Sequence, residues 1–233
     1  MRVKSQIYYD SPEEVFQQLS VIWPNLRLCY MNARSLINKR DEIEVFVKSL
    51  SDVGILLITE TWFKPGDAQF MNIQGFTLYN SDRVGPRGGG VAVYVKDTIN
   101  IKVNSAVSTY MFDILCLTGQ GTDCKRDIIL VYNSNSANLP LTLRELECVM
   151  SRANRNPTLI FGDFNVNLFG RGGLQGDLLD LMSSYGFQWL NTQHPTRESS
   201  TVSTCIDHIF SNSLTGECNL YTVRCDISDH NVF

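Results

Sequence analysis

A carboxylate and a carboxamide follow an apolar run in the segment TLIFGDFNVN, residues 158–167. The run predicts a buried strand, and Asp163 and Asn165 stand two residues apart at its end. Residues i and i+2 of an extended segment point to the same side. Both side chains could therefore reach into one site while Phe164 turns back into the core. A single pair is weak evidence, so the site needs further members.

Polar side chains also end most of the other predicted strands. In open or sandwiched α/β folds, functional sites collect where strand ends meet. We therefore expect these side chains to share one site with Asp163 and Asn165. In chain order they are Asn32, Glu60, Tyr132, Asp207, Asp229 and His230.

Hydrolysis of a phosphodiester is the chemistry that these residue types suit. Glu60 offers the hard oxygen ligands that Mg²⁺ prefers, and the ion polarises a phosphoryl oxygen. Asp163 can orient or deprotonate the attacking water. Asp207 can hold His230 in one tautomer or keep it protonated against the phosphate. Neutral partners for the phosphate oxygens are Asn32, Asn165 and Tyr132.

The elements that must position these residues are mostly strands. The runs at 54–60 and 158–161 are apolar on both faces, which indicates two sheets packed together and flanked by helices, a single α/β sandwich. Further strands are expected at 26–32, 76–80, 90–96, 111–118, 127–133, 187–191, 205–211 and 219–227, and helices at 39–51, 141–154 and 177–185. Residues 26–233 would form the domain, and 1–25 a leader of unknown role in which a short helix opens at Ser11.

Composition excludes several classes of protein. Hydrophobic residues make up 43% of the 233 residues and charged residues 19%, which is typical of a globular chain. The net charge of −4 gives no bulk attraction to nucleic acid or to an anionic membrane, so a polyanionic substrate requires a local basic rim, a bound cation, or both. No apolar stretch is long enough to span a membrane. The seven cysteines include no C-x-x-C pair, which favours buried free thiols in a reducing compartment over structural zinc.

The motifs N-A-R-S, I-T-E-T-W, G-D-F-N, I-D-H-I-F and S-D-H fall in the order found in one superfamily. Over about residues 26–230 the chain resembles the endonuclease/exonuclease/phosphatase superfamily, with its DNase I-like fold. The wording of the motifs is most similar to the apurinic-type endonuclease domain of non-LTR (LINE-type) retrotransposons. This resemblance implies a four-layer α/β/β/α sandwich of two mixed sheets flanked by helices.

The resemblance also implies roles for individual residues. Glu60 would bind Mg²⁺ (or Mn²⁺) with Asn32 beside it, and Asp229 would line the metal or orient its neighbours. Asp163 would activate the water, and Asp207 and His230 would form the paired Asp–His. Asn165 and Tyr132 would touch the phosphate, and the residues expected at the DNA are Arg34, Thr196 and Arg197.

The function implied is that of a Mg²⁺-dependent endonuclease that nicks double-stranded DNA and leaves a 3′-hydroxyl for target-primed reverse transcription. Such a domain would act in the nucleus as a monomer, with no membrane partner, beside a reverse transcriptase domain of a parent polyprotein. Two alternatives stay open: a hydrolase of phosphoinositides or other small phosphate esters, and a copy that binds nucleic acid without cutting.

One departure and one insertion bear on specificity. Cellular abasic-site enzymes of this superfamily tend to have Asp where this chain has Arg34, which argues against abasic-site repair. Between Thr196 and Asp207 the segment RESSTVSTCI is polar and β-branched, and it predicts a two-stranded hairpin beside the catalytic strand ends. Such a hairpin could enter a DNA groove and sense its width or bendability.

Overall fold

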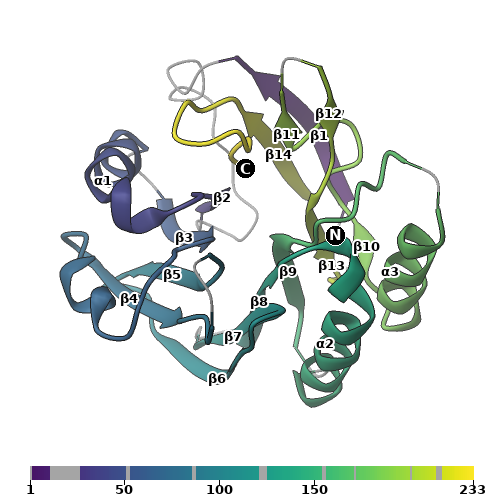
Figure 1. Ribbon diagram of the computed structural model, residues 1–233, viewed down its shortest axis with the longest axis horizontal. Coiled ribbons are helices and arrows are strands. Elements are labelled where there is room, and N and C mark those ends of the chain that lie inside the picture. Colours follow the sequence, from purple (N-terminus) through teal and green to yellow (C-terminus); the bar gives the residue numbers. More distant parts are fainter. Residues whose placement is uncertain are drawn as a thin grey trace.

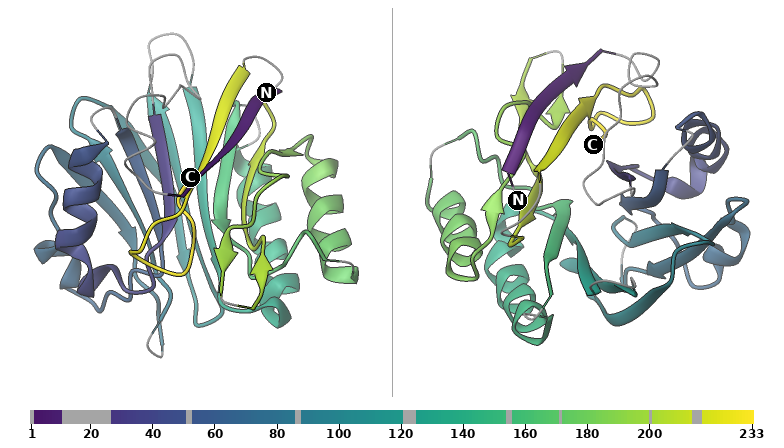
Figure 2. Two further views of the ribbon diagram at one scale, coloured as in Figure 1. Left: turned by 90° about the horizontal axis from the view of Figure 1, so that it is seen from above. Right: turned by 180° about the vertical axis from the view of Figure 1, so that it is seen from behind.

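The computed structural model is a sandwich of two mixed β-sheets with helices on both outer faces (Figures 1 and 2). It describes residues 2–10, 27–50, 53–85, 88–120, 125–153, 156–170, 172–199, 201–213 and 217–233. The layers confirm the expected four-layer α/β/β/α fold class. The helix expected from Ser11 lies outside the described residues. None of the described helices is long and apolar enough to cross a membrane.

The larger sheet is antiparallel except where β8 and β9 run parallel. That parallel pair brings the carboxyl ends of two buried strands to the same edge of the sheet. The strand order is β10 (Gln188–Trp189), β13 (Asp207–Ser211), β9 (Thr158–Asp163), β8 (Lys125–Asn133), β7 (Phe112–Gln120) and β6 (Ile101–Ser108).

The smaller sheet likewise contains one parallel pair, β2 with β3, and two antiparallel pairs. Its order is β2 (Arg27–Asn32), β3 (Val53–Thr59), β5 (Val91–Lys96) and β4 (Phe76–Ser81). All seven residues of β3 are buried, as expected for a strand covered on both faces. Because Asn32 pairs with Thr59 in the β2–β3 register, the ends of these strands also meet.

Helix α1 (Arg40–Ser49) covers the smaller sheet, and α2 (Leu139–Ala153) and α3 (Gly173–Ser184) cover the larger one. Three apolar clusters separate the layers. Leu56 and Ile58 face α1 while their neighbours Ile55 and Leu57 face the other sheet, which is the alternation of a strand with two buried faces. Single 3₁₀ turns are η2 (Leu36–Asn38), η3 (Asp67–Phe70) and η4 (Ser136–Asn138).

Two further strand pairs lie at one end of the sandwich. Strand β1 (Arg2–Tyr9) pairs in parallel with β14 (Glu217–Val223). Strands β11 (Arg197–Glu198) and β12 (Ser203–Thr204) form the antiparallel hairpin that the sequence predicts. The terminal Phe233 exchanges two backbone hydrogen bonds with Tyr30, its N–H donating at 2.9 Å and its C=O accepting at 2.7 Å, and so extends the smaller sheet beside β2.

Apart from the helix at Ser11, the expected elements all appear in the described part of the chain, with bounds that shift by a few positions. Two strands were not expected, β1 and β6. Of the six cysteines in the described part of the chain, all except Cys148 are buried, as the composition indicated.

Candidate active site

The strand topology carries the expected side chains to one end of the sandwich. Asp163 ends β9, and the antiparallel register sets Asp207 of β13 directly opposite it. Tyr132 lies opposite Asp163 on the other side, in the parallel register of β8. Asn32 ends β2, and His230 lies in the segment that follows β14.

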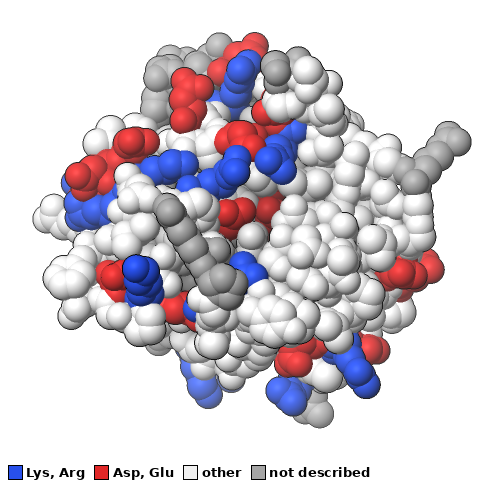
Figure 3. All heavy atoms as spheres, in the orientation of Figure 1, with Lys and Arg blue, Asp and Glu red and all other residues white. Residues whose placement is uncertain are grey.

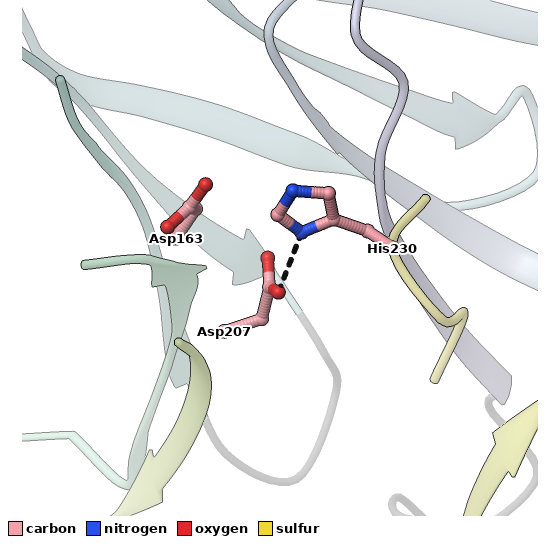
Figure 4. Close-up of side chains that lie close together, drawn as sticks. All are labelled: Asp163, Asp207 and His230. Atoms are coloured by element: carbon pink, nitrogen blue, oxygen red, sulfur yellow. Dashed lines mark hydrogen bonds and ion pairs between the residues drawn. The ribbon is translucent and has the colours of Figure 1, made fainter. Parts of the chain in front are cut away.

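Asp207 and His230 form a buried hydrogen-bonded pair (Figure 4). The Oδ2 atom of Asp207 lies 2.8 Å from Nδ1 of His230, and both side chains are almost wholly buried. The other oxygen, Oδ1, accepts a hydrogen bond from the Tyr30 hydroxyl at 2.6 Å. With both oxygens engaged, the carboxylate fixes the imidazole so that Nδ1 carries a proton and Nε2 faces away from Asp207.

The charge on His230 follows from its neighbours. Burial alone would lower the pKa of the imidazole, but the attraction and hydrogen bond of Asp207, with smaller contributions from Asp163 and Asp229, raise that pKa to about 9. The ring is therefore an imidazolium at neutral pH. A positive charge held at this point can stabilise the negative charge that develops on a phosphate undergoing attack.

Asp163 is a buried carboxyl group in an acidic neighbourhood. Burial, and then the negative charge of Asp207, raise its pKa to about 8, although the hydrogen bond from the Asn165 backbone and the charge of His230 oppose the rise. A carboxyl group with a pKa of about 8 holds its proton at neutral pH, so Asp163 can accept a proton from water only in its ionised form, which a nearby cation would favour.

Backbone geometry explains why a glycine precedes Asp163. A Cβ atom at Gly162 would stand 2.1 Å from the carbonyl oxygen of Val131 on β8, far closer than atoms can approach. Phe164 is fully buried against α2 and α3, as expected. Asn165 leaves the strand with a left-handed φ of 52°, and its N–H donates to Oδ1 of Asp163 at 2.8 Å.

Asn32 joins the two sheets at the site. Its Nδ2 atom donates to Oε1 of Glu60 at 3.0 Å and to Oδ2 of Asp163 at 2.9 Å. The other carboxylate oxygen of Glu60 accepts a hydrogen bond from the Trp62 indole at 3.0 Å. Glu60 and Trp62 both have positive φ angles, 57° and 60°, so the backbone turns sharply where the side chain enters the site.

The donor set fits a hard divalent cation. Ligand atoms of Asp163, Asp207 and His230 lie within 4.8 Å of one another, and Glu60 faces Asp163 across Asn32. Burial, and then the negative charge of Asp207, raise the pKa of Asp163, and a bound cation would favour its charged form. Because Asp207 pairs with His230, Glu60 is the better ligand for Mg²⁺ or Mn²⁺: its two oxygens accept neutral N–H groups, those of Asn32 and Trp62.

Asp229 occupies a different environment from the one that its expected role as a metal ligand requires. Its Oδ1 lies 2.9 Å from Nη1 of Arg34, and its Oδ2 lies 2.8 Å from Nε of Arg197. Both carboxylate oxygens thus pair with guanidinium groups, and Nε2 of His230 is 4.0 Å away. Asp229 is the centre of an Arg–Asp–Arg cluster and orients its neighbours, the second role that the resemblance implied.

Tyr132 and Thr196 are both buried. The guanidinium of Arg83 lies 5.9 Å from the centre of the Tyr132 ring, and burial followed by the charge of Glu60 raises the tyrosine's pKa, so its phenol stays neutral. Thr196 was expected at the DNA but is fully buried, and its Oγ1 accepts the backbone N–H groups of Ile206 and Asp207, each at 2.9 Å. In this structure Thr196 positions Asp207.

Sequence reasoning missed Tyr30 and Ser228. Tyr30 stands two residues before Asn32 on one strand, so the i, i+2 rule could have placed its hydroxyl in the site. Ser228, in the S-D-H motif, donates to the backbone oxygen of Asn32 at 2.6 Å and so ties the His230 segment to β2. His208, next to Asp207, faces the α2–α3 side of the sheet and contacts Phe164.

Comparison with known proteins identifies the chain. The model of the endonuclease/exonuclease/phosphatase family matches residues 25–230. The chain belongs to this family. Its members are phosphodiesterases and phosphatases that typically depend on a metal ion. The matched region contains Glu60, Asp163, Asp207 and His230, which together are called the acidic site.

Solved structures with the same fold come from enzymes with different substrates. The endonuclease domain of TRAS1, a telomere-specific non-LTR retrotransposon, superposes with a TM-score of 0.65 at 16% identity, covering 88% of this chain and 94% of that one. The mannosyl-6-phosphatase Bt3783 of Bacteroides thetaiotaomicron superposes with a TM-score of 0.62 at 14% identity, covering 88% of this chain and 96% of that one. The human Nocturnin catalytic domain superposes with a TM-score of 0.58 at 13% identity, covering 90% of this chain and 91% of that one. A search of curated proteins gave no match.

Proposed function

We propose that this family member is a Mg²⁺-dependent endonuclease that nicks one strand of double-stranded DNA. The observation that carries the proposal is the Arg34–Asp229–Arg197 cluster beside the acidic site, because two guanidinium groups next to a hydrolytic centre suit the flanking phosphates of a polyanion. Figure 3 supports it: acidic side chains lie at the centre of this face, with Lys and Arg gathered around them.

The site residues divide the chemistry of hydrolysis among them. Asp163 orients the attacking water and accepts its proton. The His230 imidazolium, held by Asp207, stabilises the charge on the phosphate, and the Tyr132 phenol and the Asn165 amide hold its oxygens. A divalent cation bound by Glu60 with Asn32 would supply further positive charge to the phosphoryl oxygens. Breaking the P–O3′ bond leaves a 5′-phosphate and a 3′-hydroxyl.

A 3′-hydroxyl at the nick can serve as a primer for reverse transcription. TRAS1 is a non-LTR retrotransposon, and this chain shares the fold of its endonuclease domain. We therefore propose that the nick primes reverse transcription in the nucleus, and that the domain works as a monomer beside a reverse transcriptase domain of the same polyprotein.

A small phosphate ester is the second candidate substrate. A pocket of about 660 Å³ opens beside the site, and its lining includes Trp62, Lys64 and Arg83. An indole and two cations suit a sugar phosphate or an inositol phosphate, and Bt3783, which shares the fold, is a mannosyl-6-phosphatase.

One set of reactions separates the candidates. Supercoiled plasmid is incubated with the protein in Mg²⁺, in Mn²⁺ and in EDTA, and the nicked product is offered directly to a DNA polymerase. We expect nicking that EDTA abolishes and ends that the polymerase extends, with His230→Ala protein as the control. Release of phosphate from mannose 6-phosphate or a phosphoinositide without nicking would favour the second candidate. DNA binding without either reaction would indicate a silent copy.

A further inference from the structure

Strand β1 lies outside the segment that the family model matches, yet it is part of the fold. The match begins at residue 25, whereas β1 spans Arg2–Tyr9 and pairs in parallel with β14 along nearly its whole length. Figures 1 and 2 show β1 beside β14, at the end of the molecule that carries the β11–β12 hairpin.

Gln6 holds the segment that leads into the hairpin. Its Nε2 atom donates to the carbonyl oxygen of Leu190 at 2.5 Å and to Oγ1 of Thr192 at 3.2 Å. Its Oε1 atom accepts the backbone N–H of Gln193 at 3.0 Å. One side chain thus satisfies backbone groups at two positions of a loop, which fixes the path of that loop.

Tyr8 contacts the base of the same hairpin. Its hydroxyl donates to Oε2 of Glu198 at 2.6 Å, and its ring centre lies 5.6 Å from that of His194. Residues 6 and 8 share one face of a strand, so both side chains reach segment 190–198 together. The hydrogen bond and the charge of Glu198, after burial, raise the pKa of Tyr8 to about 12, so the phenol remains a donor at any working pH.

The segment that β1 holds is joined directly to the catalytic centre. Arg197 forms a β-bridge with His230, and its side chain pairs with Asp229. The N–H of Glu198 donates to the backbone oxygen of Asp229 at 3.2 Å, and Oε2 of Glu198 also accepts Nδ2 of Asn231 at 3.1 Å. Displacement of the hairpin base would therefore displace the residues on both sides of His230.

From these contacts we infer that β1 is a positioning element for DNA recognition: through Gln6 and Tyr8 it sets the position of the β11–β12 hairpin, and of Arg197, relative to His230. The inference rests on the proposed function for its substrate, because the hairpin and Arg197 are the parts placed at the DNA. Gln6 and Tyr8 touch no reacting group, so they act through segment 190–198 on where the enzyme cuts.

β1 also makes contacts of another kind, and these provide a matched control. Ser5 donates to Oδ1 of Asn219 at 2.9 Å, a bond that ties β1 to β14 and does not reach segment 190–198. If β1 only covered the edge of β14, losing the Ser5 bond and losing the Tyr8 bond would have similar effects. If β1 positions the hairpin, the two losses differ.

The first measurement needs no DNA. Hydrogen–deuterium exchange is followed in peptides covering 194–204 for wild type, Tyr8→Phe, Gln6→Ala and Ser5→Ala. Tyr8→Phe keeps the ring and removes only the hydroxyl. We expect exchange in these peptides to become about three- to tenfold faster in Tyr8→Phe and Gln6→Ala, and to stay unchanged in Ser5→Ala. Equal exchange in all four proteins would overturn the positioning role.

The second measurement is the map of nicks along a plasmid. In Tyr8→Phe and Gln6→Ala we expect the use of preferred sites to change by about twofold or more, and KM for DNA to rise by a larger factor than kcat falls; Ser5→Ala should match wild type. Faster exchange with an unchanged nick map would overturn the link to recognition. If wild type does not nick at all, the proposed function fails, and the exchange data alone decide whether β1 positions the hairpin.

Discussion

Both carboxylate oxygens of Asp207 accept hydrogen bonds in this structure, and these bonds fix the position of the partner side chains. One oxygen takes the Tyr30 hydroxyl and the other takes Nδ1 of His230, while Thr196 fixes the backbone N–H of Asp207. An imidazolium supported in this way depends on its carboxylate for both its orientation and its charge. Loss of either Asp207 or His230 should therefore remove the contribution of both.

Alanine variants test this coupling. We expect His230→Ala and Asp207→Ala each to lower kcat for nicking by about 10²–10⁴-fold, the range of acid–base and electrostatic contributions. The double variant should lose far less than the product of the two, since the second substitution removes a partner that no longer acts. Losses that multiply fully, in proteins with wild-type circular dichroism, would show that the residues act independently.

Glu60 is expected to matter through metal binding. Glu60→Ala removes a hard oxygen ligand, so Mg²⁺ affinity should fall by at least about tenfold and nicking at millimolar Mg²⁺ should be lost while the protein stays folded. Titration calorimetry with Mg²⁺ or Mn²⁺ measures the affinity without DNA. Glu42→Ala, on the exposed face of α1, is the control. Unchanged metal affinity in folded Glu60→Ala would remove Glu60 from the ligand set.

Asp113 predicts a pH dependence of stability away from the acidic site. Its carboxylate is fully buried and accepts the N–H of Gly90 at 2.9 Å, and burial raises its pKa from 3.8 to about 6. The folded state thus holds this proton more tightly than the unfolded state, so the stability it contributes is present below about pH 4 and lost as pH rises through about 6.

Urea unfolding at several pH values tests the sign. Between pH 4 and 7, the free energy of unfolding of wild type should fall relative to that of Asp113→Asn by up to about 3 kcal/mol, because Asn cannot titrate. A difference between the two proteins that stays constant with pH would contradict the assignment.

At the scale of elements, the close approach of β8 and β9 is what brings Asp163 to Tyr132. Gly162→Ala forces a methyl group against the backbone of Val131, so we expect a loss of about 1–3 kcal/mol or more of stability together with loss of activity. Gly176→Ala in α3 has open space around its Cβ position and should stabilise the fold by about 0.5–1 kcal/mol. Thermal unfolding of both variants checks these opposite signs.

The β11–β12 hairpin permits a test of site selection that leaves the chemistry intact. Val202 at its tip is 58% exposed, although it is apolar, and none of the described tip residues belongs to the proposed site. Replacing residues 199–202 with Asn-Gly should redistribute nicks along a plasmid, while total nicking falls by much less than His230→Ala causes. Primer extension maps the nicks. Complete loss of activity in a folded variant, or an identical map, would sink the idea.

Strong periodicity made most elements predictable, and its absence hid two. Buried strands such as β3 and β9 show as continuous apolar runs, and α1 shows as Ile43, Phe46 and Val47 at helical spacing. In contrast, β6 is an edge strand with three exposed positions in succession, so it carries no alternation of apolar and polar residues. β1 has partly buried residues at almost every position and gave no clear pattern either.

The position of a side chain was predictable where it lies at the terminus of a strongly apolar strand: Asp163 ends β9 and Asp207 begins β13. It was not predictable where the position depends on tertiary contacts. The pairing of Asp229 with Arg34 and Arg197 joins three separate parts of the chain, and the burial of Thr196 depends on the β13 backbone. No local pattern reports such contacts.

At the scale of the molecule, the sign of the net charge differs from the sign of the charge around the acidic site. The chain has a net charge of −4, yet the face that carries the acidic site also gathers Lys and Arg around it. If the protein nicks DNA as proposed, its binding would rest on a few local phosphate contacts and not on a long-range field, so nicking should weaken with salt only as steeply as those few contacts require.

The pairing of Tyr30 with Phe233 has a consequence for the time at which the site comes into being. Tyr30 is synthesised long before its backbone partner Phe233 and before His230, and β1 is likewise synthesised long before β14. Contacts this distant in sequence form late and fold slowly. The site therefore forms only after Phe233 has been synthesised, although its first strands leave the ribosome much earlier.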